Sequence, residues 1–150
     1  MTSMKDRLQG DLTTAMKARD EVGSSTLRMV LTAITNEEVS GKTARVLTDE
    51  DVVTVLGREA KKRKEAAEAY DSANRPELAA RERAELVVIE GYLPEQLGED
   101  EVRAIVEAAV AEVAAGGAAM GQVMKIVQPQ VKGKADGGQV AAMVKSALGM

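Results

Sequence analysis

Residues 48–73 read TDEDVVTVLGREAKKRKEAAEAYDSA, and this stretch decides the fold class. Thr48 is a good helix N-cap, and the three acidic residues after it suit the positive end of a helix dipole. Apolar residues then recur at helical spacing along one stripe: Val52, Val53, Leu56, Ala60, Ala67 and Tyr70. We therefore predict a long helix that ends near Ala73, with charge on both sides of a narrow apolar stripe.

The rest of the chain has a composition that suits the same kind of element. Of its 150 residues 45% are hydrophobic, yet there is no Trp or Phe and only two Tyr. An aliphatic core of this kind favours helices over strands, which prefer β-branched and aromatic residues. We predict an all-α fold.

Three further helices are predicted around the long one. Ser3 caps a helix that ends near Asp20, a second helix covers Val22–Val39, and Ser40-Gly41-Lys42 stops it. On the other side, Pro76 restarts the chain, because proline is tolerated in the first turn of a helix. These four helices form a predicted N-terminal module over residues 1–93.

A break at Gly91–Gly98 separates this part from a C-terminal module of three helices, residues 94–150. The first helix runs through Val102–Val113 and is stopped by Gly116-Gly117. The second runs from Met120 through Val127 and is broken by Pro129. The third is capped by Asp136, with Gln139 completing a capping box.

The residue types that are missing restrict the possible chemistry. The chain has no Cys and no His, which excludes thiol chemistry and the commonest acid–base catalyst and metal ligand. We expect no catalytic residue, cofactor or metal. There is no apolar run of the ~20 residues that a bilayer requires and no signal peptide, so we expect a cytoplasmic protein without a membrane partner.

The turn Ser40-Gly41-Lys42-Thr43 is similar to the end of a phosphate-binding loop. Asn36 stands where the first glycine of that motif belongs, and Glu37 and Glu38 would repel phosphate. We interpret this turn as an ordinary helix end.

Five cations lie within seven residues of the long helix: Arg58, Lys61, Lys62, Arg63 and Lys64. They could grip a phosphate backbone. Alternatively they form a solvated face, since Glu59 and Arg63, Lys61 and Glu65, and Lys64 and Glu68 are spaced as i,i+4 pairs. The residues alone favour the solvated face slightly.

A second candidate is the turn Lys132–Gly138, in which glycines allow a close backbone approach and Lys132 and Lys134 flank Gly133. Residues 118–150 contain four lysines, including Lys125, and one aspartate, a local charge of +3 in a chain whose net charge is −4. The alternative is a tight interhelical turn in which Asp136 only caps. The two interpretations are equally supported.

Three stretches together resemble the signature of the GatB/YqeY family: Tyr92–Leu97 (YLPEQL), Met120–Met124 (MGQVM) and Lys132–Gly137 (KGKADG). Further stretches resemble the long-helix module of this family, namely Leu27–Met29, Ile34–Glu37, Arg58–Glu59 and Lys61–Lys64. Gly98 departs from the pattern, where a Ser cap is usual. The resemblance covers essentially the whole chain and identifies it as a stand-alone YqeY-like member.

The resemblance implies a fold similar to the tail of the B subunit of the glutamine-dependent tRNA amidotransferase, and to a domain appended to some bacterial glutaminyl-tRNA synthetases. It implies a non-catalytic accessory protein that binds tRNA. The first candidates for nucleic-acid contact are then Lys132, Gly133, Lys134 and Lys125. The second candidates are the five cations Arg58, Lys61, Lys62, Arg63 and Lys64.

Two other functions stay open. The chain could be an adaptor that docks on an aminoacyl-tRNA synthetase or an amidotransferase. It could also contribute carbon–nitrogen ligase activity with glutamine as amido-N-donor within a complex, although the amidase and kinase-like parts of such an enzyme are not recognisable in the sequence.

Overall fold

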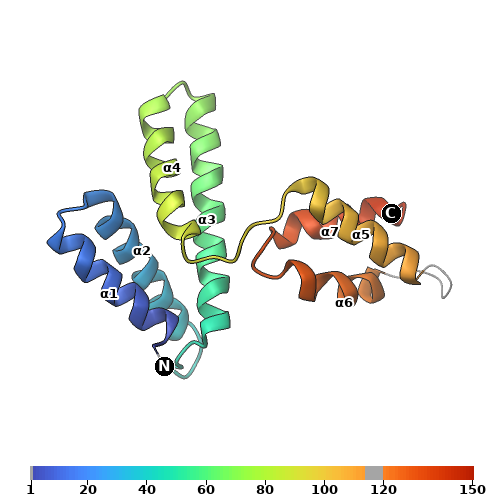
Figure 1. Cartoon of the computed structure of the whole chain (residues 1–150), viewed down its shortest axis with the longest axis horizontal. Coiled ribbons are helices and arrows are strands. Elements are labelled where there is room, and N and C mark those ends of the chain that lie inside the picture. The colour runs from blue at the N-terminus through green and yellow to red at the C-terminus, as the bar shows by residue number, and fades with distance from the viewer. Residues whose placement is uncertain (1, 114–119) are drawn as a thin grey trace. The chain divides into compact units, whose positions relative to one another are not determined.

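The computed structural model describes residues 2–113 and 120–150, and this part of the chain contains seven helices and no strand (Figure 1). The predicted all-α fold class is confirmed. The helices are α1 Met4–Lys17, α2 Glu21–Glu38, α3 Asp49–Ser72, α4 Pro76–Glu90, α5 Glu99–Val113, α6 Met120–Val131 and α7 Gly137–Ala147. They form two compact units, Met1–Leu93 and Pro94–Met150.

The first unit consists of two antiparallel helix hairpins, α1 with α2 and α3 with α4 (Figure 1). Its core is aliphatic, as the composition requires. The fully buried side chains include Leu8, Val30, Ile34, Leu56 and Ile89. Each helix thus packs an apolar stripe against its neighbours, which is the main source of stability for helices of this length.

Local capping residues set most of the helix starts. The Ser3 side chain accepts a hydrogen bond from the backbone N–H of Asp6, and the Thr48 side chain accepts one from Asp51, as predicted. Asp20 caps α2 in the same way, and Pro76 is the first residue of α4. Asn74 has a φ of 59°, a left-handed conformation that asparagine tolerates and that reverses the chain between α3 and α4.

The buried face of α3 differs from the predicted stripe. Val55 belongs to it, whereas Val53 and Tyr70 are only half-buried. Two charged residues, Glu59 and Arg63, are also buried on this face. They are tolerated there because they pair with each other, whereas an unpaired buried charge would be costly.

The second unit has its own core, built mainly from valines: Val102, Val106, Val123, Val127, Val131, Val140 and Val144. Asp136 caps α7 by accepting a hydrogen bond from the N–H of Gln139 at 3.2 Å. The predicted stop at Gly116-Gly117 lies outside the described residues.

Pro129 does not break α6, contrary to the prediction, because it lies inside the helix, which continues to Val131. Proline removes the bond from its own N–H to the carbonyl of Lys125, four residues earlier. Lys125 and Pro129 are both exposed residues. The Gln130 side chain donates a hydrogen bond to the next carbonyl, that of Ile126, at 3.0 Å.

Within residues 2–113 and 120–150, none of the helices combines the length and the apolar character that crossing a membrane requires.

Candidate functional site

The segment between α2 and α3, residues 39–48, is held at several points, and we call it the anchored loop. The Arg45 N–H donates to the Glu38 carbonyl at 2.9 Å and closes the loop at its base. Leu47 is buried in the core of the first unit, whereas Val39 and Val46 are 58% and 85% exposed. The loop therefore presents apolar side chains to solvent from a backbone that is fixed at both ends.

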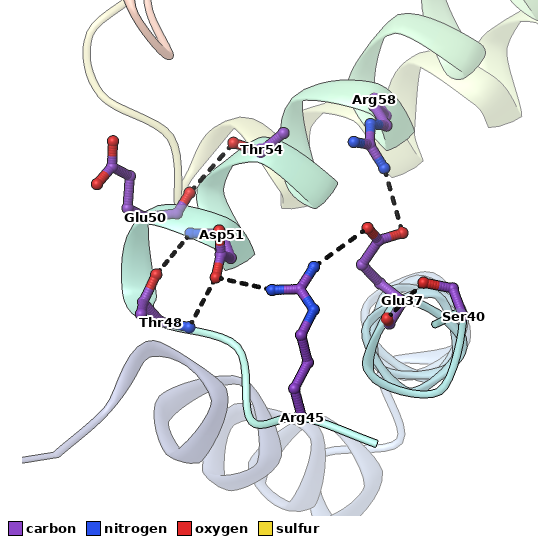
Figure 2. Close-up of polar contacts among 8 residues, drawn as sticks. All are labelled: Glu37, Ser40, Arg45, Thr48, Glu50, Asp51, Thr54 and Arg58. Atoms are coloured by element: carbon purple, nitrogen blue, oxygen red, sulfur yellow. Dashed lines mark hydrogen bonds and ion pairs between the residues drawn. The ribbon is translucent and has the colours of Figure 1, made fainter. Parts of the chain in front are cut away.

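Arg45 lies at the centre of a charge network that joins α2, the loop and α3 (Figure 2). Its Nη2 is 3.6 Å from Glu37 Oε1, and its Nη1 is 3.4 Å from Asp51 Oδ2. Arg58 reaches the other oxygen of Glu37, with Nη1 to Oε2 at 3.4 Å. Such half-exposed pairs contribute little energy singly, but two cations that share one carboxylate restrict where the loop can lie.

The start of α3 is part of the same network. Thr48 and Asp51 form a capping box, in which each side chain bonds to the backbone N–H of the other residue. The hydrogen bonds to the backbone and side chain of Thr48, followed by the charge of Arg45, hold the pKa of Asp51 below its ordinary value. The carboxylate is thus kept ionised, the form that both the cap and Arg45 require.

Helix α1 is attached next to this loop. The Lys5 Nζ lies 2.9 Å from Glu38 Oε1, and the Met4 N–H donates to Asp49 Oδ1 at 3.0 Å. Ser40 ends α2 by donating its hydroxyl to the Glu37 carbonyl at 2.9 Å. This bond supports the interpretation of the Ser40–Thr43 turn as a helix end.

The five cations predicted on α3 do not share one surface. Arg58 pairs with Glu37, and the Lys62 Nζ lies 3.0 Å from Glu59 Oε2. Arg63 is only 4% exposed and faces the core, which removes it from any surface that a ligand could reach. Lys61 and Lys64 are exposed. Nucleic-acid contact by the accessible four stays a prediction.

The α6–α7 turn is held by the chain that enters the second unit. Gly133 has a φ of 74°, in the left-handed region that favours glycine. Its carbonyl accepts a hydrogen bond from Gln96 Nε2 at 2.8 Å, and the Lys134 carbonyl accepts one from the Leu97 N–H at 2.8 Å. Two of the signature stretches, YLPEQL and KGKADG, therefore bond to each other and fix the turn.

The lysines of this turn differ in exposure. Lys132 is exposed and Lys134 is half-buried, while Lys125 is exposed on α6. Their contact with nucleic acid, with Gly133 between them, stays a prediction. The sequence did not indicate the role of Gln96, whose side-chain amide donates hydrogen bonds to the carbonyls of both Pro94 and Gly133.

Tyr92, the first residue of the YLPEQL stretch, belongs to the first unit. Its hydroxyl donates to Asp11, and the Arg7 guanidinium lies 4.7 Å from the centre of its ring. Burial, followed by the hydrogen bond to Asp11, raises the pKa of Tyr92, so that the phenol stays protonated and can act as the donor. This contact ties the end of the first unit back to α1.

Another group that the sequence analysis missed is a set of charged side chains between α3 and α4. Glu59, Arg63 and Glu85 are each less than a tenth exposed. The i,i+4 spacing of Glu59 and Arg63 was visible in the sequence, but it was interpreted as a solvent-facing pair. No group of acidic residues among residues 2–113 and 120–150 is arranged to hold a metal ion, and no catalytic domain is evident in this part of the chain.

Three of the relatives with similar sequences have the same name. Altered inheritance of mitochondria protein 41, mitochondrial, of Pyrenophora tritici-repentis is 30% identical over 147 residues, which cover 95% of this chain and 80% of that protein. The proteins of the same name in Vanderwaltozyma polyspora and Saccharomyces cerevisiae YJM789 are 35% and 32% identical over 57% and 61% of this chain. The chain spans 46% and 49% of these two yeast relatives.

These names contradict two of our predictions. The relatives are named as mitochondrial proteins, and none of the three is named as a tRNA-binding accessory protein. The prediction of a tRNA-binding accessory function is therefore wrong, and so is the prediction of a cytoplasmic location.

The family resemblance itself is confirmed. The sequence pattern of the family described as Yqey-like protein matches residues 5–148, nearly the whole chain and both compact units. The chain belongs to the Yqey-like protein family.

Proposed function

We propose that this chain is a non-catalytic protein-interaction module, and that the anchored loop is part of its contact surface. The observation that supports the proposal is the exposure of Val39 and Val46 on a segment whose backbone and charges are fixed. Val39 and Val46 directly follow Glu38 and Arg45, whose backbones are joined by a hydrogen bond. This bond keeps the Cα atoms of the two valines within roughly 10 Å of each other. They can therefore contact the same partner.

The fixed backbone is what distinguishes this site from isolated exposed valines, which are common on protein surfaces. A segment that is already ordered loses less conformational entropy on binding, so its apolar contacts add more to affinity. Arg45 precedes Val46 in the sequence, and Arg58 pairs with Glu37, two residues before Val39. These two charges can supply the polar border that protein interfaces usually have.

The first partners to test are a glutamine-dependent amidotransferase and an aminoacyl-tRNA synthetase, the two classes that the sequence resemblance implies. The full chain would be mixed with each purified, nuclease-treated enzyme, and the dissociation constant measured by calorimetry. We expect Val46→Asp to weaken binding by about tenfold or more, because it places a charge in an apolar contact.

Val87→Asp is the matched control, since Val87 is 68% exposed but lies on α4, outside the anchored loop. This variant should bind like the wild type. The proposal is wrong if neither enzyme binds, or if Val46→Asp binds as tightly as the control. Glutamine-dependent amidation by the isolated chain would contradict its non-catalytic part.

A further inference from the structure

Two partly exposed methionines of the first unit each contact an arginine through the sulfur atom. Met16 of α1 and Met29 of α2 are 44% and 45% exposed. The Arg28 Nη2 lies 3.0 Å from the sulfur of Met16, and the Arg63 Nη2 lies 3.9 Å from the sulfur of Met29. Because thioether sulfur is a weak acceptor, neither contact satisfies a guanidinium N–H fully.

The two arginines differ in their access to water. Arg28 is exposed, so water completes the hydrogen bonds that the sulfur of Met16 leaves unmade. Arg63 is only 4% exposed, and water does not reach it freely. Of the two methionines, Met29 is therefore the one whose sulfur covers a buried cation.

The guanidinium of Arg63 has one edge without a strong acceptor. Its Nη1 donates to Oε1 and to the carbonyl oxygen of Glu59, both at 3.1 Å. Its Nε is buried and has no hydrogen-bond partner among the described residues. The N–H groups of Nε and Nη2 are parallel and lie on the same edge, so an oxygen placed there accepts from this edge. A buried charged donor without an acceptor is costly, and such an oxygen would remove that cost.

We propose that Met29 is an oxidation site, at which hydrogen peroxide or another small hydroperoxide forms a sulfoxide that Arg63 binds. The sulfur of Met29 gives an electron pair to the terminal oxygen of the peroxide, an S–O bond forms and the O–O bond breaks. The proton of the transferred oxygen passes to the leaving oxygen, which departs as water or an alcohol. The sulfur is oxidised by two electrons, and the peroxide is reduced by the same two.

The location of Met29 favours both the reaction and the capture of its product. The side chain is partly exposed, so a small peroxide reaches it from solvent without opening the core. The new oxygen sits on the atom that already contacts Nη2, and the rotatable bonds of the unbranched side chain let it turn toward Nε as well.

Arg63 does not have to move to bind the sulfoxide. Glu59 holds its Nη1 and is itself in contact with the Lys62 Nζ at 3.0 Å. The open edge is therefore fixed in position, and only the side chain of Met29 rearranges. A donor pair that is already in place binds an acceptor at a lower entropic cost.

The expected consequence is the reverse of the usual effect of methionine oxidation. A sulfoxide ordinarily disrupts packing because it introduces a polar oxygen into apolar surroundings. At Met29 the oxygen meets a buried cation that lacks an acceptor, and it links α2 to α3. A sulfoxide at Met16 brings no such gain, because Arg28 is already solvated.

The test is hydrogen exchange with mass spectrometry on the full chain, oxidised so lightly with hydrogen peroxide that most molecules carry at most one sulfoxide. The α2 peptide that contains Met29 then occurs in two forms, which differ by one oxygen and are compared in the same sample. We expect the slowest amides of the oxidised form to exchange about fivefold more slowly. The α1 peptide that contains Met16 is the matched control, and its two forms should exchange at the same rate.

Two substitutions test the partner. Arg63→Lys keeps a positive charge but removes the Nε–H edge, so it should abolish the difference between the two forms of the Met29 peptide. Met29→Gln supplies an amide oxygen in place of the sulfoxide oxygen, and without any oxidant its α2 amides should exchange more slowly than those of Met29→Leu. This second comparison does not require that Arg63→Lys fold.

The proposal is overturned if Met29 gains no oxygen under conditions that oxidise Met16, or if its oxidised peptide exchanges as fast as the unoxidised one. It is equally overturned if a sulfoxide at Met16 slows exchange to the same extent. Equal exchange in Met29→Gln and Met29→Leu, or an effect of oxidation that persists in Arg63→Lys, would show that Arg63 does not bind the new oxygen.

Discussion

Gln96 connects two parts of the second unit that are 37 residues apart in the sequence. Its side-chain amide donates to the carbonyls of Pro94 and Gly133, both at 2.8 Å. The first bond fixes the chain that leads into α5, and the second fixes the left-handed residue of the α6–α7 turn. One half-buried amide thus satisfies two backbone acceptors that lack a helical partner.

We expect Gln96→Ala to lower the free energy of unfolding of the second unit by about 1–3 kcal/mol, because two hydrogen bonds are lost and neither acceptor is replaced. Thermal unfolding followed by circular dichroism would measure the change. Gln122→Ala, an exposed substitution on α6, is the control and should change stability by no more than a few tenths of a kcal/mol. Equal effects of the two variants would show that the bonds of Gln96 contribute nothing.

At the level of single residues, the sequence predicts N-cap residues better than it predicts whether a charged side chain is buried. Ser3, Thr48 and Asp136 were recognised because an N-cap bonds to a backbone N–H only a few residues away. Arg63 was placed on the surface because its spacing from Glu59 suits a solvent-facing pair equally well. Its burial depends on α2 and α4, which the local sequence does not reveal.

The charge network of the anchored loop was also not predicted. Arg45 meets Asp51 six residues further on and Glu37 on a different helix. The first contact is local, but the second exists only once α2 and α3 have packed. Of this site the sequence therefore indicated the cap at Thr48 and the turn at Ser40, and the link between them came from the structure.

Among the helices, α6 shows where a local rule was applied too strictly. Proline is unfavourable inside a helix by about 3 kcal/mol, so a stop at Pro129 was a reasonable prediction. The helix continues because Val127 and Val131 both pack into the core of the second unit. The burial of these two valines offsets the lost backbone bond and carries the helix one turn further.

If the burial of Val127 and Val131 offsets the cost of Pro129, Pro129→Ala should stabilise the second unit by about 1–3 kcal/mol. The substitution restores a backbone hydrogen bond and removes a steric conflict near the end of the helix. Chemical denaturation of the full chain would measure the gain. Gln128→Ala, at the preceding exposed position, is the control and should give at most a few tenths of a kcal/mol. A loss of stability in Pro129→Ala would indicate that the proline ring itself contributes to packing.

For the molecule as a whole, the division of the core matters more than the number of helices. Apart from Ala67 and Ala79, the buried apolar residues of the described chain fall into two clusters that share no member, one within residues 8–89 and one within residues 102–144. Each cluster belongs to one of the two compact units. Since apolar burial is the main driving force of folding, each unit has its own source of stability.

Separate cores lead to a prediction about cooperativity. Leu56→Ala opens a cavity in the first unit and should destabilise it by about 2–5 kcal/mol, whereas Val127→Ala should destabilise the second by about 1.5–4 kcal/mol. We expect each substitution to lower the hydrogen-exchange protection of helices in its own unit only, measured on the full chain by mass spectrometry. Loss of protection in both units after either substitution would mean that the chain unfolds as one cooperative body. In that case the boundary at Pro94 would divide the core without dividing the stability, because the two units would then depend on each other for folding.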